Sequence, residues 1–147
     1  MSDVASQLFE REAIRELIAR VGRLLDTKDF AAVIASFAEP GSYVLRAYSP
    51  EIGKEMIWMS VKRAEHVHDL ADRTHQITVD QISLEKGEAL ARSTFSVFRT
   101  DMKGQSDLFA VGHYEDRLVK NGDTWLIDSR TVRLHTRMFT VPTPLPL

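Results

Sequence analysis

The chain contains no cysteine, and this absence excludes several kinds of chemistry from it. Disulfides, thiolate nucleophiles, cysteine-ligated zinc sites and iron–sulfur clusters all require thiol sulfur. Long apolar runs are also lacking, so we expect neither a signal peptide nor a transmembrane helix. Neither sign of charge dominates, because 19 basic and 21 acidic residues give a formal net charge of −2. The composition therefore predicts a cytoplasmic protein that binds neither nucleic acid nor a membrane.

The 147 residues have the length and the make-up of one globular domain, with 44% hydrophobic and 27% charged residues. We expect a single domain over residues 1–147. Three of the five prolines, Pro142, Pro144 and Pro146, fall at the C-terminal end. Because proline is excluded from helix interiors and from central strands, residues 139–147 are predicted to form an extended arm.

The first third of the chain has helical periodicity. Apolar residues recur at helical spacing between Ile14 and Leu25 and predict an amphipathic helix. A second, shorter helix is predicted over residues 30–37, capped by Thr27 or Asp29 and ended by the breaker Pro40-Gly41.

The middle of the chain is less regular. Residues 43–45 predict a short strand, whereas residues 54–61 fit a strand as well as a helix. The polar residues 62–73 are rich in helix formers and predict a third helix.

From His75 onward the sequence predicts long strands joined by tight turns. Lys86-Gly87, Lys103-Gly104 and Asn121-Gly122 separate four β-rich runs, and Asn-Gly is a strong hairpin signal. The runs cover residues 75–85, 88–101, 105–120 and 123–138. Gly112 and a shift of the apolar phase between Ile127 and Val132 predict β-bulges. We therefore expect an α+β fold in which the N-terminal helices pack into a curved antiparallel sheet shaped as a cone.

Two histidines in the predicted strands are candidates for acid–base chemistry. His75 and His113 could face the inside of the cone, where an imidazole can act as a base near neutral pH. Asp26, Asp29 or Tyr43 on the helical side could orient the ring. A hydrogen-bonded structural histidine is the commoner role for a single strand residue, so both interpretations stay open.

The segment His66-Val67-His68-Asp69 is the other histidine-rich part of the chain. On a helix, two positions separated by one residue diverge by about 200°, and no third ligand follows at a regular spacing. The segment therefore indicates a solvated helix face, and we expect no metal or cofactor on this chain.

Arg130, Arg133 and Arg137 crowd the last predicted strand. Because arginine is enriched at protein interfaces, they predict a contact with another subunit, to which Tyr114 and Trp58 would contribute. A cross-strand ladder of ion pairs is the alternative for residues 112–117. Trp125, directly after the Asn-Gly turn, fits the core and an interface equally well.

Three runs in the last third, DLFAVGHYEDRL (107–118), NGDTWLI (121–127) and SRTVRLHTR (129–137), together resemble a known hairpin. It is the C-terminal hairpin of the beta (small) subunits of Rieske-type aromatic-ring-hydroxylating dioxygenases. The N-terminal helix pair is similar as well, and the segment AYSPEIGKEMIW (47–58) resembles the small subunit of methanesulfonate monooxygenase. The chain departs from the family in being shorter around residues 62–73 and in its proline-rich tail.

The resemblance implies a cystatin-like fold, similar to nuclear transport factor 2, and a structural subunit without an active site. Such a subunit associates as a trimer and packs against a catalytic alpha subunit. That partner would carry the Rieske [2Fe-2S] cluster and the mononuclear iron. The absence of cysteine agrees with this division, because a Rieske cluster needs two cysteines and two histidines.

The same fold also houses isomerases and polyketide cyclases, so it does not decide the function. The alternative is a stand-alone acid–base enzyme or small-molecule binder with a pocket inside the cone. An open pocket lined by polar groups would favour this alternative. A cone filled by Phe95, Phe98, Phe109 and leucines would count against it.

Overall fold

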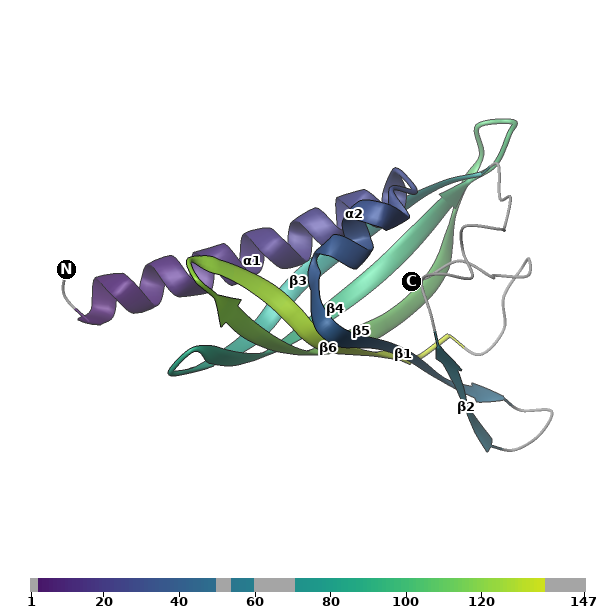
Figure 1. The fold of residues 1–147 in the computed structure, drawn as a ribbon. Helices are drawn as coiled ribbons and strands as arrows, with labels where there is room; N and C mark the ends of the chain where they lie inside the picture. The colour runs from purple at the N-terminus through teal and green to yellow at the C-terminus, as the bar shows by residue number, and fades with distance from the viewer. Residues whose placement is uncertain (1–2, 50–53, 60–70, 137–147) are drawn as a thin grey trace.

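The computed structural model describes residues 3–49, 54–59 and 71–136, with side chains outside residues 40–59. A long N-terminal helix lies across one face of a curved sheet, and a short helix lies beside its C-terminal end (Figure 1). The helices are α1 (Asp3–Asp26) and α2 (Phe30–Ala35). The strands are β1 (Phe37–Ser49), β2 (Lys54–Met59), β3 (Asp72–Glu85), β4 (Glu88–Thr100), β5 (Ser106–Asn121) and β6 (Thr124–Leu134). The predicted α+β fold is confirmed, and no helix in the described ranges is long and apolar enough to cross a membrane.

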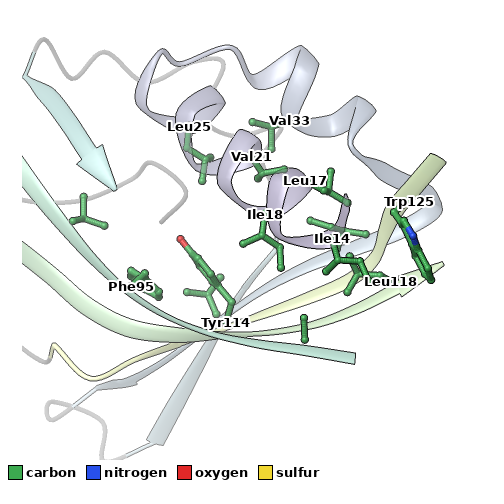
Figure 2. Close-up of a cluster of buried hydrophobic side chains, with 14 of the residues drawn as sticks. Ile14, Leu17, Ile18, Val21, Leu25, Val33, Phe95, Tyr114, Leu118 and Trp125 are labelled. Atoms are coloured by element: carbon green, nitrogen blue, oxygen red, sulfur yellow. The ribbon is translucent and has the colours of Figure 1, made fainter. Parts of the chain in front are cut away.

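Both predicted N-terminal helices form, but α2 ends at Ala35, and Phe37, which was predicted to be helical, is the first residue of β1. The apolar stripe of α1 is buried against the sheet at Ile14, Ile18 and Val21 (Figure 2). The turn after α1 places Lys28 in a left-handed conformation with a φ of 60°. Asp29 then caps α2, because its Oδ1 accepts the backbone N–H of Ala32 at 3.2 Å.

Strand β1 passes through Pro40-Gly41, where the sequence predicted a break. The pairing of β1 with β6 changes register between Phe37 and Ser42. Pro40 and Gly41 therefore lie in an irregular part of the ladder. Proline has no backbone N–H, and it is tolerated there because this irregular part of the ladder does not require a hydrogen bond from it. The strand predicted at residues 43–45 is confirmed, and residues 54–59 form a strand rather than a helix.

The predicted third helix falls mainly at residues 62–70, which lie outside the described residues. Its last two residues, Asp72 and Arg73, are the first residues of β3, so the helix prediction is wrong there. Tertiary pairing overrides the local helix propensity, since Arg73 pairs with Arg99 of β4.

The strand order in the sheet is β2-β1-β6-β5-β4-β3. Strands β3 to β6 form the predicted antiparallel meander, with hairpin turns at Gly87, Gly104 and Gly122. The sheet differs from the prediction in one respect, because β1 runs parallel to β6 and the sheet is therefore mixed.

Three single-residue register shifts bend the described part of the meander. Val79 and Gln81 pair with consecutive residues of β4, which leaves Asp80 as the inserted residue. Phe109 is the inserted residue of β5, and Asp128 is that of β6. The bulge at Asp128 lies in the predicted interval between Ile127 and Val132 and is confirmed.

Gly112 is not a bulge, which corrects the sequence prediction. It pairs in regular register with Phe95 of β4 and with Leu134 of β6. A Cβ on Gly112 would lie 2.4 Å from the carbonyl oxygen of Arg133 and 2.8 Å from Cζ of Phe95. The glycine is therefore required by the close approach of its neighbours rather than by a change of register.

The core lies between α1 and the concave face of the sheet (Figure 2). Phe95 and Tyr114 project from the sheet toward the helix, and their stacked rings are 4.4 Å apart between centroids. Phe109 is also buried, while Phe98 is half-buried. Large side chains thus fill much of the described part of the cone.

Candidate functional site

Asp26 and His75 meet at the end of α1. Asp26 is the last residue of the helix, and its two carboxylate oxygens accept the backbone N–H of His75 at 3.0 and 3.1 Å. The ring nitrogen Nδ1 of His75 lies 2.5 Å from Oδ1 of Asp26. Gly22 allows α1 to approach β3 at this point, because a Cβ there would meet Ile77 at 2.6 Å.

This arrangement assigns the proton on the imidazole. A carboxylate can only accept, so Nδ1 of His75 carries a hydrogen, and in the neutral ring the lone pair is then on Nε2. The His75 side chain is 1% exposed, and its Nε2 is buried without a hydrogen-bond partner among the described residues. An oriented neutral imidazole whose second nitrogen has no hydrogen-bond partner in the described part of the chain has the form of a proton acceptor.

Among the described side chains, the structure brings together two of the five residues that the sequence proposed for acid–base chemistry, Asp26 and His75. Asp29 caps α2 instead of contacting a histidine. The backbone of Tyr43 pairs with Arg130, and its side chain lies outside the described part. His113 lies on the other face of the sheet from buried Tyr114, because neighbouring residues of a strand point to opposite faces.

Arg130 and Asp116 lie in the core, where the sequence predicted a surface contact for Arg130. Nε and Nη2 of Arg130 donate to the two carboxylate oxygens of Asp116 at 2.7 and 2.8 Å. Both side chains are fully buried, and the guanidinium lies 4.0 Å above the ring of Tyr114. Tyr114 is fully buried as well, so neither it nor Arg130 lies at the surface expected for an interface. The bidentate pair makes the burial of two charges tolerable.

Of the other three residues predicted at an interface, the structure describes the side chain of Arg133. Arg133 has a side chain that is 41% exposed, and its Nε donates to Glu115 at 3.0 Å. Trp58 belongs to β2, but its side chain lies outside the described part, as does Arg137. The contacts of Arg133 with Glu115 and of Arg117 with Glu88 agree with the alternative prediction of a cross-strand ladder.

The exposed side chains of Glu88, Glu115, Arg117 and Arg133 lie on one surface of β4, β5 and β6, which we call the outer face. His113 and His135 meet there, with Nδ1 of the first 3.0 Å from Nε2 of the second. Nε2 of His113 lies 3.3 Å from Oε1 of Glu115. Burial is the largest single influence and raises the pKa of the Glu115 carboxyl, but the hydrogen bonds and electrostatic attraction of Arg133 and His113 together lower it by more, so the net shift is downward. The sequence analysis missed His135, although its position two residues beyond Arg133 places both on one face of the strand.

Glu10 anchors α1 to the hairpin of β5 and β6. Its carboxylate accepts a hydrogen bond from Lys120 and one from Nε1 of Trp125 at 2.5 Å. The hydrogen bond from Lys120 lowers the pKa of the Glu10 carboxyl, against a smaller opposing effect of burial. Trp125 is 5% exposed and belongs to the core, which settles its role within this chain.

Two of the grooves that are lined by described residues have volumes of about 440 Å³ or more. One, of about 440 Å³, lies on the outer face and includes Arg92, Glu115 and Thr131. The other, of about 500 Å³, lies between α1 and the start of β6 and includes Arg20 and Trp125. His75 and Asp26 line neither groove. Among the described side chains, no group of three or more histidine or acidic residues is placed to hold a metal ion.

A family model described as the SnoaL-like domain matches residues 6–131. The chain belongs to the SnoaL-like domain family. This match covers both helices and the sheet as far as β6. Within the family, the chain is similar to small subunits of oxygenases, so the resemblance seen in the sequence is confirmed.

Two characterised relatives align with most of the chain. The beta subunit of the methanesulfonate monooxygenase hydroxylase of Methylosulfonomonas methylovora is 29% identical, over 92% of this chain and 86% of its own length. The beta subunit of 2-aminobenzenesulfonate 2,3-dioxygenase of an Alcaligenes species is 21% identical, over 85% of this chain and 91% of its own length.

Solved structures share the fold at lower identity. The beta subunit of a proposed aromatic-ring-hydroxylating dioxygenase from Novosphingobium aromaticivorans superposes with a TM-score of 0.73 at 20% identity, covering 90% of this chain and 94% of its own. A proposed scytalone dehydratase from the same organism gives 0.70 at 18% identity, covering 98% and 97%. Subunit and enzyme thus share one architecture.

Proposed function

We propose that this chain is the small, structural subunit of a Rieske-type non-haem iron oxygenase and assembles with a catalytic large subunit. The observation that carries the proposal is the similarity to two oxygenase beta subunits along nearly the whole chain. Both relatives are named for oxygenases of sulfonated compounds, so a sulfonate is the substrate class that we propose for the complex. The complex would be cytoplasmic.

The composition of the chain supports this division of labour. A Rieske cluster is held by two cysteines and two histidines, and the sequence has no cysteine. This chain therefore does not fit the cluster, and we place both the cluster and the mononuclear iron on the large subunit. The small subunit would contribute surface and rigidity.

We further propose that the small subunit associates as a trimer through the outer face and the C-terminal arm. Arg133 is the described arginine of the predicted interface whose side chain is partly exposed. Its Nε is oriented by Glu115, and its partly exposed guanidinium lies where a neighbouring subunit could contact it. In a closed ring each copy would give one surface and receive another.

Co-expression with the large subunit of a Rieske-type oxygenase from the same organism tests the proposal. We expect the two chains to co-elute as one assembly, and oxygenase activity to require both. Sedimentation gives the number of copies of each. A large subunit that is fully active alone and never co-elutes with this chain would exclude the subunit function.

The His75–Asp26 contact favours a second candidate, an acid–base enzyme that acts on a small molecule inside the cone. The buried and unused lone pair of His75 Nε2 is the specific observation. In the subunit function, the same contact only ties α1 to β3 through the backbone N–H of His75.

Proton exchange in deuterated water separates the two candidates. A panel of cyclic ketones is incubated with the protein, and loss of the protons next to the carbonyl is followed by NMR. A base would accelerate this exchange, and Asp26→Asn and His75→Gln would slow it. Asp29→Asn, which affects only the cap of α2, is the matched control. Exchange no faster with the wild type than with Asp26→Asn excludes the enzyme for this substrate class.

A further inference from the structure

The contact between His113 and His135 holds two imidazole nitrogens at the spacing of metal ligands. His113 belongs to β5, and His135 follows the last residue of β6. The backbone extends the ladder to this point, because the N–H of His135 donates to the carbonyl of Val111 at 2.8 Å. The hydroxyl of Thr136 then accepts the N–H of Val111 at 2.7 Å. Both rings are thus positioned by backbone pairing.

Glu115 and Arg133 decide which nitrogen of His113 is available. Oε1 of Glu115 accepts from Nε2 of His113 at 3.3 Å and from Nε of Arg133 at 3.0 Å. Because a carboxylate only accepts, the proton of the neutral His113 ring is on Nε2, and the lone pair of Nδ1 faces His135. A carboxylate behind a histidine is the usual support of a histidine that binds a metal.

The distance between the two facing nitrogens fits one shared ion. Metal–nitrogen distances of about 2.0–2.1 Å place two ligands about 2.9 Å apart at a 90° angle and about 3.3 Å apart in a tetrahedron. The observed separation of Nδ1 of His113 and Nε2 of His135 is 3.0 Å. In the single chain, His135 is exposed and the His113 side chain is 13% exposed, so an ion can reach the two nitrogens before the outer face is covered by another subunit.

We propose that His113 and His135 form a site for a divalent transition metal ion, of the type of Zn²⁺, Cu²⁺ or Ni²⁺, on the outer face. Imidazole nitrogen is a preferred ligand of these ions. On binding, the hydrogen of the His135 ring moves from Nε2 to Nδ1 by exchange with solvent, and two metal–nitrogen bonds replace one hydrogen bond. The protein supplies two ligands, and water completes the coordination.

Titration of the full-length, untagged protein with zinc chloride tests the site by calorimetry. The background variant His66→Ala/His68→Ala is used so that the other histidine-rich segment does not contribute ligands. We expect one saturable zinc ion per chain, and loss of its binding in His113→Ala and in His135→Ala. Glu115→Gln should weaken binding by about 10- to 100-fold, as for other carboxylates that support a ligand.

Glu88→Gln is the matched control, because Glu88 is also an exposed acid that pairs with an arginine of β5 but does not touch either histidine. It should leave zinc affinity unchanged. A second measurement needs no variant: in nitrogen-15 NMR spectra of the wild-type side chains, zinc should shift Nδ1 of His113 and Nε2 of His135. Zinc binding that persists without these histidines, equal losses in Glu88→Gln and Glu115→Gln, or unshifted ring nitrogens would overturn the proposal.

Discussion

Arg130 and Asp116 form a bidentate ion pair in the middle of the sheet, with both side chains fully buried. Arg130 lies directly opposite Asp116 in the pairing of β5 with β6. The guanidinium also covers the ring of Tyr114, which in turn stacks on Phe95. The charged pair and the two aromatic rings therefore form one continuous packed group in the core.

Breaking this pair should destabilise the fold strongly. Asp116→Ala leaves the buried guanidinium without its carboxylate, and we expect a loss of about 3–5 kcal/mol in the free energy of unfolding. Denaturant unfolding measures the loss. The double variant Arg130→Met/Asp116→Leu removes both charges and should cost less than Asp116→Ala alone. A single-variant cost below about 1 kcal/mol, the range of exposed pairs, would contradict the role of the pair.

Replacing Gly112 should destabilise the protein through packing. In Gly112→Ala the new methyl group meets the Arg133 carbonyl and the Phe95 ring, so we expect a loss of about 1–3 kcal/mol by thermal or chemical unfolding. Gly87→Ala is the control, because that site is open and only its φ of 76° opposes alanine. An equal cost at both positions would show that backbone conformation, not close packing, determines the residue at 112.

The Glu10 contacts should make stability depend on acid pH. The pKa of Glu10 is lower in the folded protein than in the unfolded chain, chiefly because Lys120 donates to the carboxylate. The contribution is therefore complete above the unfolded pKa of about 4.3 and is lost as the pH falls through the lower folded value. Unfolding of the wild type and of Glu10→Gln at a series of pH values measures it. The difference between them should shrink below about pH 4, and a difference that grows there would contradict the assignment.

Arg133→Ala tests the proposed trimer. Arg133 is partly exposed and outside the core, so its replacement should leave the melting temperature nearly unchanged. If the residue is buried between subunits, association should weaken by about 1–3 kcal/mol, which sedimentation equilibrium resolves. Arg117→Ala, at the other exposed ion pair of the outer face, shows whether the effect is specific to Arg133. A wild type that stays monomeric, both alone and with its large subunit, excludes the trimer.

Local patterns determined much of the fold. The helical spacing from Ile14 to Leu25 and the Asn121-Gly122 turn predict α1 and the last hairpin because each depends on neighbours along the chain. The alternation in β5 likewise predicts that Tyr114 and Asp116 share one face. The same rules wrongly placed Arg130 at the surface. Its side chain is buried because Asp116 of β5 supplies a carboxylate, and because the bulge at Asp128 turns Arg130 toward the core face of β6.

The candidate site shows the same division between local and distant information. The sequence alone proposed His75 with three possible partners, and only the packing of α1 against β3 selects Asp26 over Asp29. It proposed His113 for the same pocket, whereas strand register pairs that residue with His135 on the outer face. Residue identity determines which chemistry is available, because it sets the functional groups. Tertiary structure decides which groups meet, because distances between segments depend on packing that no local period encodes.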